Sequence, residues 1–140
     1  MSLGVPCQVQ VTSRQQLDGE ESKTKQSLPG QFYIKGADLY LLYEEEEETG
    51  VRIKNRLTIK GGSLTVTRGG TVTSRMEFAP GGSYDFQYHT PYGIFDFRAE
   101  TKCLAISREG NALEVDLSYD LFSGDQLVSH NEIHWKSLPL

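Results

Sequence analysis

The chain has 140 residues, and its 14 lysines and arginines against 19 aspartates and glutamates give a formal net charge of -5 at pH 7. This length suits one domain and leaves no room for two full cores, so we expect residues 1–140 to form a single domain with a loose N-terminus at 1–6. The acidic balance weighs against a nucleic-acid binder and against an anionic membrane surface. No apolar run approaches the roughly 18 residues that a spanning helix needs.

The start of the chain and its cysteines bear on location. Residues 1–6 lack a basic region followed by an apolar stretch, so they do not look like a signal peptide. The two cysteines, Cys7 and Cys103, are too few for a disulfide framework and are expected to be buried, inert thiols. We therefore expect a soluble, reduced protein of the cytoplasm.

Fourteen glycines fall at regular intervals, with β-rich segments between them. This pattern predicts many short antiparallel strands joined by tight turns. The first feature in chain order is the polar segment 15–25, which reads as the least structured part and carries a turn at Asp18–Gly19.

The next hairpin can be tested by its register, because side chains alternate between the two faces of a sheet. A turn at Thr49–Gly50 sets Leu42 opposite Leu57. The same register sets Tyr40 opposite Ile59, so both pairs share the apolar face.

Three further turns follow along the chain. A three-residue loop at 68–70 is expected to set Val66 opposite Val72, with glycine supplying the left-handed residue of a bulge. Two-residue turns are expected at Pro91–Tyr92 and at Gly110–Asn111, where each register pairs apolar residues on one face.

The last two strands complete the pattern. The apolar alternation changes phase near Lys102–Cys103, which predicts a bulge or sharp bend there. A loop over 122–126 then sets Val115 opposite Ile133, and Asn131 points inward.

About ten strands with one apolar face each, joined by short turns, describe an up-and-down meander, and closing such a sheet removes its exposed edges. We therefore predict an all-β protein, a single closed or nearly closed antiparallel barrel of about ten strands. A barrel of this size has an interior that side chains can fill or that can hold one small ligand.

Short motifs between about Val9 and Trp135 add a family resemblance. They are, in order, Phe32-Tyr33-Ile34-Lys35, Leu39-Tyr40-Leu41-Leu42-Tyr43-Glu44, Thr67-Arg68-Gly69-Gly70-Thr71-Val72, Met76-Glu77-Phe78, Tyr88 with Thr90-Pro91-Tyr92-Gly93, Thr101-Lys102 and Leu117-Ser118-Tyr119-Asp120. In this order and spacing they resemble the YwiB-like family, a bacterial domain of unknown function. The resemblance implies a calycin-like or lipocalin-like barrel in the cytoplasm and brings no catalytic residues. Small-molecule binding follows from it only by analogy of fold.

Polar side chains on the face assigned inward form the first candidate site. They are Tyr40, Asn55, Tyr88, Tyr119, Asn131 and Trp135. Apolar walls with a few polar groups are typical of a ligand site, so the leading function is non-covalent binding of a small apolar or amphipathic ligand. The alternative is a filled barrel whose polar groups satisfy one another or buried water. Such a barrel would serve as a structural or interaction module, working through its surface or as a homodimer.

A second candidate site lies on one strand, where His130, Glu132 and His134 share a face. Residues two apart on a strand stand about 6.7 Å apart, close enough to share a metal, and Asp116 and Glu114 across the ladder could add oxygens. The ends of the row stand about 13 Å apart, too far for one ion. A polar outer face is therefore the better interpretation, and we assign neither a metal nor another cofactor. No nucleophile or oxyanion arrangement accompanies the row, so an enzyme is the less favoured class.

Overall fold

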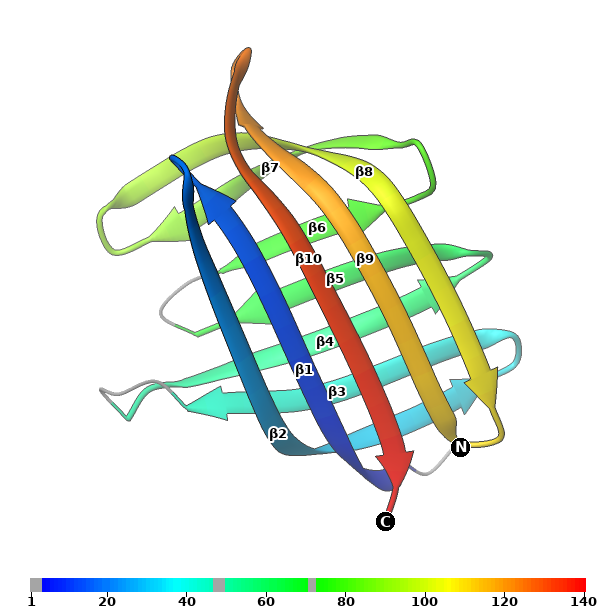
Figure 1. Ribbon diagram of the computed structural model, residues 1–140. Helices are drawn as coiled ribbons and strands as arrows, with labels where there is room; N and C mark the ends of the chain where they lie inside the picture. Colours follow the sequence, from blue (N-terminus) through cyan, green and yellow to red (C-terminus); the bar gives the residue numbers. More distant parts are fainter. Residues whose placement is uncertain (1–3, 47–49, 71–72) are drawn as a thin grey trace.

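The computed structural model describes residues 4–46, 50–70 and 73–140. Its strands are β1 (Val5–Leu17), β2 (Glu20–Lys35), β3 (Asp38–Glu46), β4 (Arg52–Lys60), β5 (Ser63–Gly69), β6 (Ser74–Phe78), β7 (Ser83–Thr90), β8 (Gly93–Glu109), β9 (Ala112–Ser123) and β10 (Gln126–Pro139). They form one sheet in the order β6-β5-β4-β3-β2-β1-β10-β9-β8-β7, with every neighbouring pair antiparallel. The first and last strands therefore lie side by side (Figure 1).

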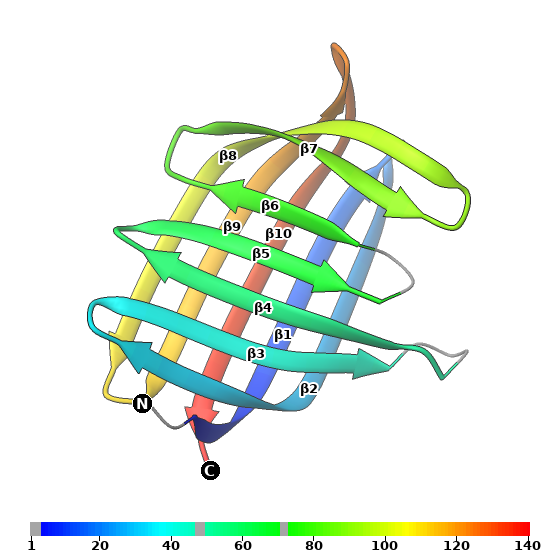
Figure 2. The same ribbon diagram turned by 180° about the vertical axis from the view of Figure 1, so that it is seen from behind.

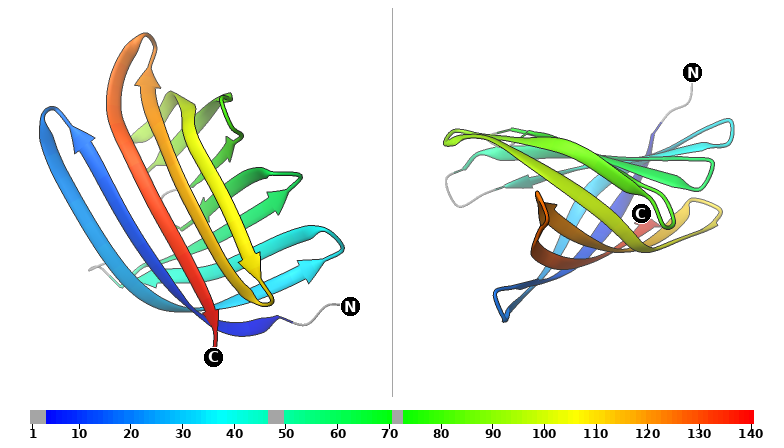
Figure 3. Two further views of the ribbon diagram at one scale, coloured as in Figure 1. Left: turned by 45° about the vertical axis from the view of Figure 1, so that its right-hand side comes forward. Right: turned by 90° about the horizontal axis from the view of Figure 1, so that it is seen from above.

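The sheet folds into two layers because two long strands each take part in both. Seen from behind, β3 to β7 cross in front of β1, β9 and β10 (Figure 2). β2 spans 16 residues and β8 spans 17, and each passes from one layer to the other (Figure 3). The corner in β2 lies near Gly30, where pairing with β3 begins. The corner in β8 lies at a register shift between Thr101 and Cys103.

The barrel is nearly closed at the junction of β6 and β7. There Thr73 N donates to His89 O at 3.0 Å, and His89 N donates to Thr73 O at 3.0 Å, which forms an isolated bridge. The prediction of an all-β, antiparallel, nearly closed barrel of about ten strands is confirmed. His89 itself is exposed.

The core lies between the two layers and is filled by alternate side chains of nearly every strand. Its largest fully buried apolar side chains are Phe32, Leu41, Leu57, Leu64, Val9 and Val115. A single alternating apolar face on each strand is what the sequence pattern required of a half-buried sheet.

Several predicted local features are confirmed. Two-residue turns join β7 to β8, where Thr90 pairs with Gly93, and β8 to β9, where Glu109 pairs with Ala112. The bulge is also found where the alternation changes phase, and Lys102 is its extra residue.

The bulge changes the face of β8 on which Cys103 lies. Cys103 pairs with Ser118 on the outer face and is exposed, so the prediction that it is buried is wrong. A regular alternation would place Cys103 on the same face as Thr101, but the extra residue Lys102 moves Cys103 to the outer face. Cys7, by contrast, is fully buried as expected.

The register of the β3–β4 hairpin differs from the prediction by one residue. Leu41, not Leu42, lies opposite Leu57, and Tyr43 lies opposite Asn55. The predicted two-residue turn at Thr49–Gly50 is wrong, because the ladder between β3 and β4 already ends at the pair Glu46–Arg52. Thr49 itself lies outside the described residues. A one-residue slip exchanges the faces of a strand, so Tyr40 lies on the outer face, opposite Thr58.

Two other hairpins are shifted by an even number of residues. Val66 pairs with Met76 rather than with Val72, which lies outside the described residues. Ile133 pairs with Leu117 rather than with Val115, since a tight turn and a register shift between Leu127 and Ser129 replace the longer loop. Even shifts keep every side chain on its predicted face.

The N-terminal hairpin is more regular than predicted. Val5 and Pro6 belong to β1, and Leu140 N donates to Pro6 O at 3.2 Å, so these two residues are not loose. The turn at Asp18–Gly19 is confirmed, because Leu17 pairs with Glu20. The polar segment around it is strand, with most of its side chains exposed.

Gly30 at the β2 corner should not tolerate a side chain. A Cβ there would lie 2.7 Å from the backbone oxygen of Leu42 and 2.8 Å from Val9 Cγ2. We expect Gly30→Ala to lower the free energy of unfolding by about 1–3 kcal/mol, measured by urea denaturation. The control Gly69→Ala meets nothing within 4 Å and should change it by less than about 0.5 kcal/mol. Equal effects of the two substitutions would contradict the crowded corner.

Candidate functional site

The inner face of the β7–β8 hairpin carries a row of aromatic side chains, which we call the inner aromatic cluster. Its members are Tyr84, Phe86, Tyr88, Phe95 and Phe97. Phe97 lies at its centre, with ring centroids 5.9 Å from Phe86, 6.2 Å from Tyr88 and 6.4 Å from Phe95.

The inner aromatic cluster faces inward but is incompletely covered. Along β8, Ala99 and Thr101 share its face and are buried. Phe95 on the same face is nevertheless 46 % exposed, and Phe86, Tyr88 and Phe97 are only partly buried. The side chains of the inner aromatic cluster are therefore less covered than Phe32, which is fully buried.

Tyr119 of β9 lies close to Tyr88 of this cluster and to Arg68. It belongs to a set of inward-facing polar side chains that we call the polar wall: Glu45, Asn55, Arg68, Tyr119 and Asn131. Its ring packs against Phe78 at 4.9 Å between centroids. Burial raises the pKa of Tyr119 to about 12, with a smaller lowering by the charge of Arg68 and a further rise from Tyr88. The phenol thus stays neutral at physiological pH, close to Arg68 and Tyr88.

Arg68 and Glu45 form an inward-facing ion pair bridged by an amide. Arg68 Nη2 lies 3.6 Å from Glu45 Oε2. Asn55 accepts from Arg68 Nε at 3.2 Å and donates to Glu45 at 3.2 Å and to the Ile53 carbonyl at 3.3 Å. All the polar atoms of the Asn55 side chain are therefore engaged within the protein.

The indole of Trp135 is also satisfied internally. Trp135 Nε1 donates to the Tyr43 hydroxyl at 2.9 Å across the core. Burial raises the pKa of Tyr43 to about 12, while this hydrogen bond opposes the rise.

The six predicted interior residues can now be placed. Asn55, Tyr88, Tyr119, Asn131 and Trp135 face inward as expected, whereas Tyr40 faces outward. Asn131 accepts from Gln15 Nε2 at 3.1 Å and donates to Ser129 Oγ at 2.9 Å. The hydroxyl of Tyr119 shows no hydrogen bond to a side chain in the part of the chain that the structure describes.

Sequence reasoning missed three inward residues. The one-residue register error placed Tyr43 and Glu45 on the outer face, and the predicted loop at 68–70 left Arg68 outside the strands. A signal for Arg68 was present, since it stands two and four residues after Val66 and Leu64 on one strand.

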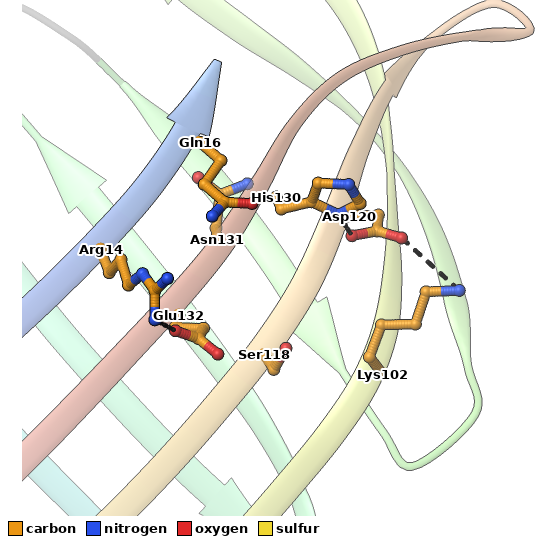
Figure 4. Close-up of a pocket in the computed structure, with 8 residues that line it drawn as sticks. All are labelled: Arg14, Gln16, Lys102, Ser118, Asp120, His130, Asn131 and Glu132. Carbon is orange, nitrogen blue, oxygen red and sulfur yellow. Dashed lines mark hydrogen bonds and ion pairs between the residues drawn. The ribbon is translucent and has the colours of Figure 1, made fainter. Parts of the chain in front are cut away.

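A groove of about 440 Å³ lies on the outer face of β1, β8, β9 and β10 (Figure 4). Within it Asp120, only 8 % exposed, contacts His130 Nδ1 and lies 3.5 Å from Lys102 Nζ. Beside them, Arg14 Nη1 lies 3.5 Å from Glu132 Oε2. His130 and Glu132 are thus paired with different partners.

The third member of the predicted row belongs to another cluster. His134 Nε2 lies 2.8 Å from Glu114 Oε1 and 3.8 Å from Asp116 Oδ1. The possible ligand atoms of these three residues all lie within 4.8 Å of one another. The shared face of His130, Glu132 and His134 is confirmed, but only His134 joins a set of potential metal ligands.

Together the ten antiparallel strands and the bridge between Thr73 and His89 define a nearly closed β-barrel protein. The chain belongs to the DUF1934 family, a domain of unknown function, whose family model matches residues 9–134. The resemblance to the YwiB-like family is thereby confirmed. Among the described residues, no helix is long and apolar enough to cross a membrane.

Two comparisons point to the same relative. The chain is 25 % identical over 126 residues to the uncharacterized β-barrel protein YwiB of Bacillus subtilis (strain 168). The aligned region covers 90 % of this chain and 88 % of YwiB. The crystal structure of the Bacillus subtilis YwiB protein matches with a TM-score of 0.86 at 22 % identity, covering 98 % of this chain and 93 % of that one. At this identity the match establishes the fold.

The buried tyrosines predict the behaviour of the protein in alkali. Of the seven tyrosines, Tyr43 and Tyr119 should ionise near pH 12 in the folded protein, against an ordinary pKa of 10.0. Above pH 10 the unfolded chain loses these protons first, so the free energy of unfolding should fall by about 1.4 kcal/mol per pH unit for each tyrosine. Below pH 10 neither group should affect stability.

Tyrosinate absorbance and alkaline denaturation test this prediction. Tyr119→Phe should remove about half of the fall between pH 10 and 12, because Tyr43 still contributes its share. Tyr92→Phe, at a side chain that is 93 % exposed, should leave the fall unchanged. Simultaneous titration of all tyrosines near pH 10 in the folded protein would contradict it.

Proposed function

We propose that the less filled end of the barrel binds a small, partly apolar ligand without catalysis. The observation that supports this most is the inner aromatic cluster, which faces the interior while Phe95 is 46 % exposed. Exposed apolar surface is favourable to cover, because burial of apolar area stabilises a complex by about 25 cal/mol per Å².

The polar wall suggests how such a ligand would be oriented. The Tyr119 hydroxyl is neutral and has no side-chain hydrogen bond among the described residues, and Asn131 lies opposite Tyr119 in the β9–β10 ladder. Because Glu45 offsets the charge of Arg68, the wall favours a neutral hydroxyl or amide over an anion. Asn55 and Trp135 would then shape the wall without contributing free hydrogen-bonding groups.

The filled-barrel alternative draws on the packed part of the interior. Phe32, Leu57 and Leu64 are fully buried, so much of the interior is ordinary core. On this alternative the protein acts through its surface, and the inner aromatic cluster closes over itself in solution. A cytoplasmic location remains a prediction under both functions.

A neutral fluorescent probe, N-phenyl-1-naphthylamine, distinguishes the two functions. We expect saturable fluorescence enhancement at one probe per chain, weakened about fivefold or more by Phe95→Ser through loss of apolar contact. The matched control is Ile94→Ser, the neighbouring residue on the outer face, 59 % exposed, which should change the affinity less than about twofold.

Native mass spectrometry of gently purified protein complements the probe. A reproducible added mass that is lost on denaturation, and reduced in Phe95→Ser, would support ligand binding. Absence of both added mass and probe binding, in protein with an unchanged circular dichroism spectrum, would contradict the proposal.

A second candidate function is divalent-metal binding on the outer face. Glu114, Asp116 and His134 supply one nitrogen and two carboxylates on the paired strands β9 and β10. Three protein ligands with an open fourth position are a known arrangement for zinc. This set replaces the predicted row of His130, Glu132 and His134.

Isothermal titration with zinc tests this candidate. His134→Ala should weaken binding at least about tenfold, as loss of one of three ligands would. Glu132→Ala should leave binding unchanged, because Glu132 shares the face but pairs with Arg14 instead. No binding by the wild-type protein, or equal loss in both variants, would exclude the site.

A further inference from the structure

The first half of β2 has a free edge. Residues 20–29 pair with β1 along their whole length, whereas pairing with β3 begins only at Gly30. In the described residues no strand lies along the other side of 20–29, and Figure 3 shows this part of β2 at the margin of its layer. Side chains 20–27 are all exposed, so this edge is open to another strand.

The turn geometry identifies the backbone groups that point outward. Leu17 and Glu20 close the two-residue turn and exchange hydrogen bonds, and such pairs alternate along an antiparallel ladder. Residues with even numbers in this part of β2 therefore face β1. The N–H and C=O groups of Glu21, Lys23, Lys25 and Ser27 face away from β1 and are available to a partner strand.

The charges along this edge are complementary to those of a second copy of the same edge that runs antiparallel to it. Two glutamates at 20 and 21 come first, and lysines follow at 23 and 25. We propose that this edge pairs antiparallel with the same edge of a second copy of the chain, forming a homodimer with Ser22 on the two-fold axis. In that register Glu21 lies opposite Lys23 of the partner subunit, and Lys23 lies opposite the partner's Glu21.

The same features could also be read as protection against pairing, because lysine and proline often blunt sheet edges. A protective row of one sign repels its own copy, whereas this segment carries two acids and two bases. The Glu21 carboxylate already lies 2.5 Å from Arg14 Nε and 3.6 Å from Lys23 Nζ, so its position favours basic partners. Pro29 lies at the end of the edge, beyond the paired stretch.

This inference is independent of the proposed ligand site, because none of the edge residues belongs to the inner aromatic cluster. A dimer of this kind would join the β2-β1-β10-β9-β8 layers of two barrels into one continuous sheet. It requires no change in the intrachain ladder, since the outward groups make no hydrogen bonds with β1.

Sedimentation velocity over a wide range of protein concentration tests the dimer. We expect a monomer–dimer equilibrium in the wild-type protein. Lys23→Glu should weaken dimerisation about tenfold or more, because it sets like charges opposite each other at two symmetric positions. The double variant Glu21→Lys/Lys23→Glu restores opposite charges and should recover dimerisation. A monomer at every concentration, or a dimer that Lys23→Glu does not weaken, would overturn the proposal.

Disulfide trapping tests the register. In a Cys103→Ser background, which removes the exposed thiol, Ser22→Cys should form an intersubunit disulfide on mild oxidation, because its two copies face each other across the axis. The matched control Ser27→Cys lies on the same exposed strand but far from its own copy in this register. Trapping through residue 27 and not through residue 22 would overturn the proposed pairing.

Discussion

The constraint on which the structure depends is the closure of one antiparallel sheet around its single apolar face. Each strand has only one side suited to a core, so a flat sheet would leave that side in water. Closure requires two strands to turn a corner, and each does so by a different device. β8 turns at the bulge that follows Thr101, whereas β2 turns where Gly30 lets the backbone of Leu42 approach closely.

Closure also explains why one end of the barrel is packed and the other is open. Near Gly30 the two layers meet, and Phe32, Val9 and Leu41 fill the space between them. Toward the N-terminal end of β2 the layers diverge, because residues 20–29 pair with β1 alone. A single row across that layer begins with three polar side chains, Ser22, Gln15 and Asn131, and reaches an aromatic one only at Tyr119 of β9.

How much of this could be predicted from the sequence depends on the parity of register errors. The two hairpins shifted by even numbers kept their faces, so the inward positions of Asn131 and Trp135 were predicted correctly. The hairpin shifted by one residue exchanged Tyr40 for Tyr43, because an apolar run such as Leu39 to Tyr43 offers suitable residues to both faces. The inward position of Glu45 was hidden by the same one-residue register error, and Arg68 falls within the predicted loop at 68–70, although it continues the alternation of Leu64 and Val66.

The divergence of β2 from β3 links the two proposals physically, although each is tested separately. The departure of β2 from the layer of β3 leaves its edge unpaired and its inner positions at Ser22, Thr24 and Gln26 uncovered. The same departure leaves Phe95 and Tyr88 without a full layer of side chains opposite them. A ligand and a second subunit would therefore complete two different parts of the structure that this divergence leaves open. The ligand would cover apolar surface, and the second strand would complete the backbone hydrogen bonds of the β2 edge.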